Sequence, residues 1–218
     1  MTYCVDVAST YFIDHPLVAD KIRQLRDEKT TNADFLRLAG EIARFVAYEA
    51  FRDAKVSPTT VDTPVVKGAP AVKADTQYII IPILRAGLGM SPAAQEILPV
   101  HRVCLMGLRR NEETLLPDVY LDGVPEDLGG APIVICDPML ATGGSLVCVL
   151  DIIAQRNPGP VTVLCLLAAQ PGLDFVLSKY PDIKIFGAAL DAKLTDVVTS
   201  HLDLVTLATD SLALQFAN

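Results

Sequence analysis

The stretch that decides the fold is Ile133-Val134-Ile135-Cys136-Asp137-Pro138-Met139-Leu140-Ala141-Thr142-Gly143-Gly144-Ser145. It begins with an unbroken apolar run, which is typical of a parallel strand buried on both faces. The run ends at Asp137, and a loop then closes on Thr-Gly-Gly-Ser before a helical apolar pattern begins. A strand, a short loop and a helix in this order predict a βαβ unit.

The chemistry of the loop Asp137–Ser145 suits a phosphorylated sugar. Ligands of open α/β sheets bind beyond the carboxyl ends of the strands. Gly143 and Gly144 let the backbone approach a ligand closely, and the amides at the start of the following helix attract an anion. Thr142 and Ser145 add hydroxyl donors, and Asp137 can accept hydrogen bonds from sugar hydroxyls or act through a cation. An ordinary strand–helix turn is the alternative; the loop is neither a Walker loop nor G-x-G-x-x-G.

Apolar runs alternate with helical patterns along the middle of the chain, and this alternation predicts a mostly parallel sheet flanked by helices. We expect strands at 78–83, 102–107, 132–136, 161–168 and 183–188, and helices at 87–97 and 144–156. Residues 112–130 indicate a hairpin or a long loop. The N-terminal part predicts two helices, one opened by Pro16 over 17–26 and one after the caps Thr30–Asn32, and the chain then looks extended at 58–70. A further strand is expected near 202–207.

Composition and charge exclude several classes of function. The net charge is −8 with no run of Lys or Arg, which argues against nucleic acid and anionic membranes as partners. Apolar runs such as Val161–Ala169 are far shorter than the roughly 20 residues of a spanning helix, and the first ten residues do not resemble a signal peptide. Five cysteines without a C-x-x-C pair predict reduced thiols, and three scattered histidines offer no zinc site. We therefore expect a cytoplasmic protein.

Residues 137–145, Asp-Pro-Met-Leu-Ala-Thr-Gly-Gly-Ser, resemble residue for residue the ribose-phosphate loop of uracil phosphoribosyltransferases. Other stretches look like the same family, namely His15-Pro16-Leu17-Val18, Ala47-Tyr48-Glu49-Ala50, Pro82 to Met90, and Arg110-Asn111-Glu112-Glu113-Thr114. The resemblance covers about residues 14–190. It implies a single α/β domain over 1–218 with the type I phosphoribosyltransferase fold. That domain would have a helical part at 15–56, a core at 77–190 with an arm at 112–130, and a C-terminal hood at 191–218.

The resemblance also implies a reaction. The family transfers the phosphoribosyl group of 5-phosphoribosyl-1-diphosphate to N1 of uracil, which gives UMP and pyrophosphate. The transition state should be oxocarbenium-like, so that positioning and neutralisation of charge do most of the catalysis. By resemblance Arg85 and Arg110 would contact the diphosphate, although the adjacent Arg109 could share that role. Mg²⁺ would be the cofactor, and the protein would form a homodimer or a higher homo-oligomer. The residues implied for ribose and 5-phosphate are Asp137, Pro138, Met139, Leu140, Ala141, Thr142, Gly143, Gly144 and Ser145.

Two neighbouring glutamates could be mistaken for a catalytic pair. Glu112 and Glu113 follow Arg110, but adjacent carboxylates in a polar loop are expected to be solvated or paired with Arg.

The C-terminal segment departs from the family. Where the family has Ile-Val-Pro-Gly-Leu-Gly-Asp-Ala-Gly-Asp-Arg, this chain reads Leu204 to Leu214 without those glycines, and only the first Asp survives, as Asp210. In the family, backbone groups at the positions of Leu204 and Thr209–Ser211 bind uracil, and the Asp helps to hold the donor and, indirectly, its metal ion. Thr209 could not adopt a positive φ cheaply if the family's glycine needs one. The uracil-binding segment, with Leu204, Thr209, Asp210 and Ser211, is therefore either rebuilt or absent.

Four hypotheses remain at this point. The chain is a uracil phosphoribosyltransferase with a divergent hood, a non-catalytic paralogue that binds phosphoribosyl ligands, or a phosphoribosyltransferase for another base. The fourth is a flavodoxin-like or other doubly wound fold without this activity, which would make the nine-residue loop a coincidence.

Overall fold

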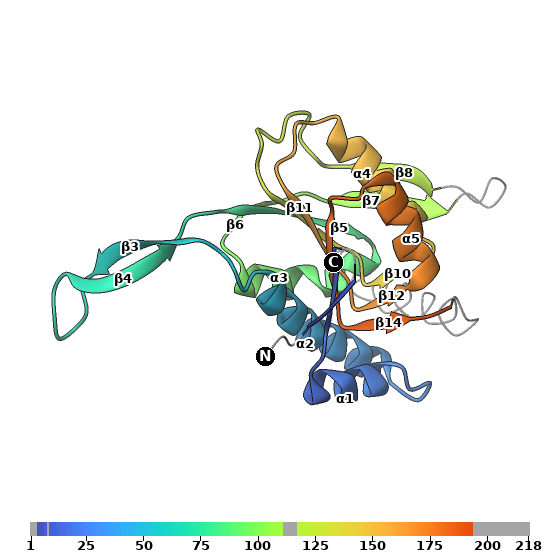
Figure 1. Cartoon of the computed structure of the whole chain (residues 1–218), viewed down its shortest axis with the longest axis horizontal. Coiled ribbons are helices and arrows are strands. Elements are labelled where there is room, and N and C mark those ends of the chain that lie inside the picture. The colour runs from blue at the N-terminus through green and yellow to red at the C-terminus, as the bar shows by residue number, and fades with distance from the viewer. Residues whose placement is uncertain (1–3, 8, 111–116, 194–218) are drawn as a thin grey trace, which may run out of the picture.

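A mostly parallel sheet runs through the centre of the computed structural model, which describes all residues except 1–3, 8, 111–116 and 194–218 (Figure 1). Strands β1–β2 and β7–β8 pair antiparallel, and the other neighbours in this sheet are parallel. The predicted α/β class is confirmed. The strand order is β1 (Cys4–Val7), β2 (Thr10–Ile13), β13 (Lys184–Gly187), β11 (Val161–Leu164), β9 (Ile133–Cys136), β5 (Tyr78–Leu84), β7 (Met106–Arg110) and β8 (Pro117–Asp122), with β6 (Val100–Val103) also on β5.

Helices cover both faces of the sheet (Figure 1). Side chains alternate between the faces of a strand, so Ile80 belongs to one buried cluster, while Ile79 and Ile81 belong to the other. Both faces are apolar, which is why these strands have no polar alternation. The first cluster packs with α1 (Pro16–Leu25), α2 (Asn32–Ala50) and α3 (Ser91–Ile97), and the second with α4 (Gly144–Ala154) and α5 (Gln170–Lys179).

The N-terminal helices begin where their caps predict. His15 accepts a hydrogen bond from the Leu17 amide at 3.2 Å, with Pro16 in the first turn of α1. Thr31 accepts from the Asp34 amide at 3.2 Å and so caps α2. The helix expected over 87–97 is instead a 3₁₀ turn, η1 (Ala86–Gly89), followed by α3. Proline stands in the first turn of α3 and favours a new helix start there.

Two of the predicted strands are followed closely by a second, short strand. Residues 161–168 divide into β11 and β12 (Leu167–Ala169), whereas the strand predicted at 183–188 corresponds to β13 and is followed by β14 (Ala189–Asp191), which was not predicted. The first member of each pair lies in the central sheet. The second joins β10 (Met139–Leu140) in a separate sheet of order β10-β12-β14, here called the small sheet. Because β10 likewise follows β9, the chain passes from the central sheet to the small sheet three times, each time after the carboxyl end of a parallel strand.

A hairpin extends from the body in a stretch that we expected only to be extended. It is the antiparallel pair of β3 (Val56–Val61) and β4 (Ala69–Ala74) (Figure 1). Of the arm expected at 112–130, residues 112–116 lie outside the described residues, and β8 lies along β7 at the edge of the central sheet. The strand predicted at 202–207 lies outside the described residues.

The cysteines that can be placed with their side chains are reduced, as expected. Cys104, Cys136 and Cys165 are buried and Cys148 is half-buried. Burial, with a smaller contribution from the charge of the neighbouring Asp137, raises the pKa of the Cys136 thiol to about 12. Such thiols are packing residues rather than nucleophiles.

Candidate active site

Three predicted site residues lie at the carboxyl ends of neighbouring strands. Strand β5 pairs with β7 on one side and with β9 on the other. Arg110 is the last residue of β7, Arg85 directly follows β5, and Asp137 directly follows β9. Because these strands are parallel, the three residues lie at the same end of the sheet, beyond the carboxyl ends of the strands, where open α/β sheets bind their ligands.

The glycines of the loop have different tasks. Gly143 has φ 79° and is the N-cap of α4, and a Cβ there would lie 2.8 Å from the Gly172 carbonyl oxygen. At Gly144 a Cβ would make only ordinary van der Waals contacts, with Thr142 Oγ1 at 3.8 Å as the nearest atom. The first amides of a helix have no partner within it and carry the positive end of the helix dipole. The start of α4 is therefore a place where an anion can approach the backbone.

The loop consists of an anchored half and an open half. Pro138, Met139 and Leu140 are buried, and the Pro138 carbonyl accepts hydrogen bonds from the amides of Leu166 and Leu167 at 3.0 and 3.1 Å. Ala141 is half-buried, whereas Thr142 and Ser145 are exposed. The side chains of the anchored half belong to the core, so this half can contact a ligand mainly through its backbone amides and carbonyls. The hydroxyls of the open half are available to solvent or to a ligand.

Asp137 has an unusual electrostatic environment. Burial of its carboxyl group raises the pKa to about 7, although the amide of Met139 donates a hydrogen bond that lowers it. Its own amide donates to the Leu164 carbonyl at 3.0 Å, which fixes the backbone at the end of β9. A carboxyl group with a strongly raised pKa at the carboxyl end of a strand in an open α/β sheet is a candidate functional group.

The turn that contains Arg85 packs closely against the end of β9. A Cβ on Gly87 would lie 2.6 Å from the Cys136 carbonyl oxygen, so only glycine fits there. Arg85 itself is exposed, and its carbonyl accepts from the Leu88 amide at 3.1 Å. The peptide bond between Leu84 and Arg85 is cis. The close backbone approach brings the turn after β5 next to Asp137.

The end of β7 also lies near the loop. Arg110 pairs in register with Pro117, and Pro117 Cγ is 3.9 Å from the position of a Cβ on Gly144. Arg109, the alternative to Arg110 for the diphosphate contact, pairs across the hairpin instead, because its Nε donates to Asp118 Oδ2 at 2.8 Å. The backbone of Arg110 therefore ends β7 close to the loop, and its contact with the diphosphate, rather than that of Arg109, stays a prediction.

Several predicted residues lie outside the described residues. They are Glu112 and Glu113 after β7, and Leu204, Thr209, Asp210 and Ser211 in the C-terminal segment. Their roles stay predictions.

Sequence reasoning missed one contributor to the site. Gly172 in the first turn of α5 touches the loop, because a Cβ there would lie 2.4 Å from the Ala141 carbonyl oxygen. The signal was the Gln170-Pro171-Gly172 sequence after an apolar strand, which marks a helix start but not its contact partner.

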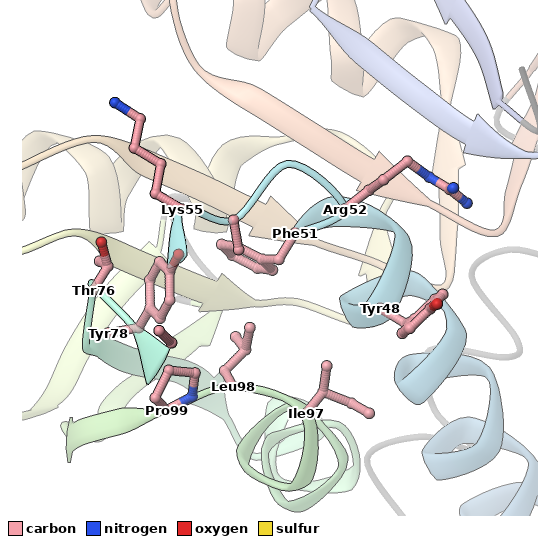
Figure 2. A pocket seen from close by; sticks show the side chains of 11 residues that line it. Tyr48, Phe51, Arg52, Lys55, Thr76, Tyr78, Ile97, Leu98 and Pro99 are labelled. Atoms are coloured by element: carbon pink, nitrogen blue, oxygen red, sulfur yellow. The ribbon is translucent and has the colours of Figure 1, made fainter. Parts of the chain in front are cut away.

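A pocket of about 410 Å³ lies at the opposite edge of the sheet (Figure 2). Tyr78 is the first residue of β5 and Pro99 directly precedes β6, which places the pocket at the amino ends of these strands. The rings of Phe51 and Tyr78 meet edge to face with centroids 4.7 Å apart. None of the predicted site residues lines it. The lining residues are Tyr48, Phe51, Arg52, Ala54, Lys55, Ala74, Thr76, Tyr78, Ile97, Leu98 and Pro99.

The described helices are all too short or too polar to cross a membrane.

Comparisons with known proteins agree with the predicted family. The family model described as uracil phosphoribosyltransferase matches residues 12–200. A uracil phosphoribosyltransferase of Kineococcus radiotolerans is 42% identical over 187 residues, and one of Ureaplasma urealyticum serovar 10 is 39% identical over 184. Each alignment covers 84% of this chain and 89% of the relative.

Solved structures share the fold. The AQ2163 protein of Aquifex aeolicus matches with a TM-score of 0.77 and 32% identity, over 86% of this chain and 89% of that one. Adenine phosphoribosyltransferase of Leishmania donovani matches with a TM-score of 0.59 over 89% of both chains. At 15% identity this second match concerns the fold alone.

Proposed function

The chain belongs to the uracil phosphoribosyltransferase family, and we propose that it transfers the phosphoribosyl group of 5-phosphoribosyl-1-diphosphate to N1 of uracil. The observation that carries this proposal is the loop 137–145 at the carboxyl end of β9, beside the strand ends that bear Arg85 and Arg110. The products are UMP and pyrophosphate. The reaction breaks the bond between the anomeric carbon and the diphosphate oxygen, forms the bond to N1, and releases the N1 proton.

The proposed roles follow from the charge that develops. As the diphosphate leaves, negative charge grows on its oxygens, and the guanidinium groups of Arg85 and Arg110 are suited to neutralise it because they stay charged and present several donors. The 5-phosphate lies against the start of α4, where Gly144 presents backbone without a Cβ and Thr142 and Ser145 are exposed. Asp137 accepts hydrogen bonds from the ribose hydroxyls in its ionised form.

The residues of this site fit a Mg²⁺ ion that binds together with the substrate's diphosphate. The described residues contain no cluster of three or more His, Cys, Asp or Glu that could hold a metal ion. Mg²⁺ is usually held by one or two carboxylates together with substrate phosphates, so one carboxylate at the sheet edge suffices. Asp137 would be that carboxylate in the described part, and Asp210 is proposed to act indirectly. When bound, the ion would neutralise the diphosphate leaving group.

We propose that the C-terminal segment binds uracil through its backbone. Every residue except proline offers both an amide and a carbonyl, so Leu204, Thr209 and Ser211 can present the pattern that uracil needs without the family's side chains. Loss of the glycines changes which backbone conformations are accessible, but not the hydrogen-bonding groups.

We also propose a cytoplasmic homodimer in which the β3–β4 hairpin packs on a second copy. The hairpin extends from the body, and its valines are exposed, with Val65 at 90% and Val72 at 68% (Figure 1). An isolated two-stranded hairpin is marginally stable in water, so cover from a partner would stabilise it.

A panel of bases tests the proposed reaction. Pyrophosphate release is measured with the donor, Mg²⁺ and, in turn, uracil, cytosine, adenine, guanine or hypoxanthine. The proposal expects release with uracil alone. Release with another base would favour a phosphoribosyltransferase of different specificity. Binding of the donor by calorimetry without release with any base would favour a non-catalytic binder.

A further inference from the structure

The small sheet connects the donor loop to the edge of the molecule by backbone hydrogen bonds. The Pro138 carbonyl accepts from the amides of Leu166 and Leu167 at 3.0 and 3.1 Å. The Leu166 carbonyl in turn accepts from the amides of Ala188 and Ala189, each at 3.1 Å. The position of Pro138, which directly follows Asp137, is thus tied to the position of the chain entering β14.

This sheet has little stability of its own. Its strands β10, β12 and β14 have two or three residues each. Strands of that length are at the lower limit for globular proteins, and small isolated sheets are marginally stable in water. Strand β14 lies at the edge of the small sheet. Whatever holds β14 from outside therefore also steadies β12 and the loop strand β10.

An ion pair holds β14 from outside. Arg26 Nη2 lies 2.8 Å from Oδ1 of Asp191, the last residue of β14, with side-chain exposures of 37% and 23%. Arg26 is the C-cap of α1, and its amide donates to the Ile22 carbonyl at 3.0 Å. Helix α1 is anchored in the core by Val18, Ile22 and Leu25. The guanidinium group thus extends from a helix anchored in the core to β14, the outer strand of the small sheet as described.

We propose that Arg26 is a positioning residue for the donor loop, acting through Asp191 and the small sheet. Arg26 itself does not touch the substrate in this account. The inference rests on the proposed function, since it assigns the loop to the donor. Because the pair is partly exposed, its loss should loosen the small sheet rather than unfold the protein.

The test compares two ion pairs of the same helix. Arg26→Gln removes the link to β14, and Lys21→Gln is the matched control, because Lys21 pairs with Glu41 of α2 at 2.5 Å with similar exposure. We expect Arg26→Gln to raise the Kd of the donor, measured by calorimetry, by roughly threefold to tenfold, and Lys21→Gln to leave it unchanged. The double charge reversal Arg26→Asp with Asp191→Arg should restore most of the affinity.

Hydrogen exchange supplies a readout that needs no activity. In Arg26→Gln the amides of Leu166, Leu167 and Ala189 should exchange faster, while those of the central strand β9 stay protected. Equal weakening of donor binding in both single variants, or unchanged exchange in the small sheet, would overturn the proposal. A wild-type protein that does not bind the donor would instead contradict the proposed function, and the exchange result would still decide whether Arg26 anchors the sheet.

Discussion

Gly172 offers the strongest test of how the donor loop is held. A Cβ at this position would lie 2.4 Å from the Ala141 carbonyl oxygen, whereas ordinary contact begins at 3.4 Å. Gly172→Ala must therefore move the loop away from α5 by about 1 Å, and forced overpacking of this kind costs about 1–3 kcal/mol. A displacement of about 1 Å in a substrate-positioning group can reduce the rate by about 10²-fold.

A glycine in another helix, Gly40 of α2, offers a matched control for this substitution. Alanine is better than glycine in a helix interior by about 0.8–1 kcal/mol. Gly40, inside α2, has its nearest neighbour, Arg44 Nη1, at 3.6 Å from the would-be Cβ, so Gly40→Ala should raise the melting temperature and leave activity alone. We expect Gly172→Ala to lower kcat/KM for the donor by about tenfold to a hundredfold without raising the melting temperature. The reasoning would be refuted if Gly172→Ala behaved like Gly40→Ala in both measurements.

Three further predictions concern charge and assembly. Native Asp137 has a pKa of about 7 against an ordinary value of 3.8, so it keeps a proton that the unfolded chain has lost between these values. The free energy of unfolding should therefore fall as pH rises from 5 to 7 and then level off, and calorimetric melts of Asp137→Asn should lose this slope. Arg110→Ala should lower kcat/KM by about 10²–10³-fold. Arg109→Ala breaks, among the described residues, an exposed ion pair with side-chain exposures of 70% and 43%, and should change kcat/KM by less than about threefold; equal effects in steady-state assays would contradict this assignment. Replacing both Val65 and Val66 by Asp should convert a dimer to a monomer in analytical ultracentrifugation, and an unchanged dimer would exclude the hairpin from the interface.

Local patterns predicted much of this molecule. The strand ending at Asp137, the two glycines and the helix after them are adjacent in sequence, so their geometry follows from nearby residues. The same holds for the caps His15 and Thr31, whose side chains bond to amides two and three residues away.

Contacts between distant segments could not be predicted in the same way. Strand β10 has two residues and exists because β12 pairs with it, so the loop carries no local strand signal. The largely apolar run from Val161 continues through the bend at Leu166, so no local pattern marked the change of sheet. The hairpin β3–β4 looked merely extended, because its pairing joins residues such as Val56 and Ala74.

The central claim is that the loop 137–145 serves the transfer of a phosphoribosyl group to uracil. The most direct test incubates the purified full chain with 5-phosphoribosyl-1-diphosphate, Mg²⁺ and labelled uracil, and quantifies labelled UMP by chromatography. The account predicts UMP in many-fold molar excess over enzyme, at a rate that falls sharply in Arg85→Ala. Folded wild-type protein that forms no labelled UMP above a blank without enzyme would contradict it.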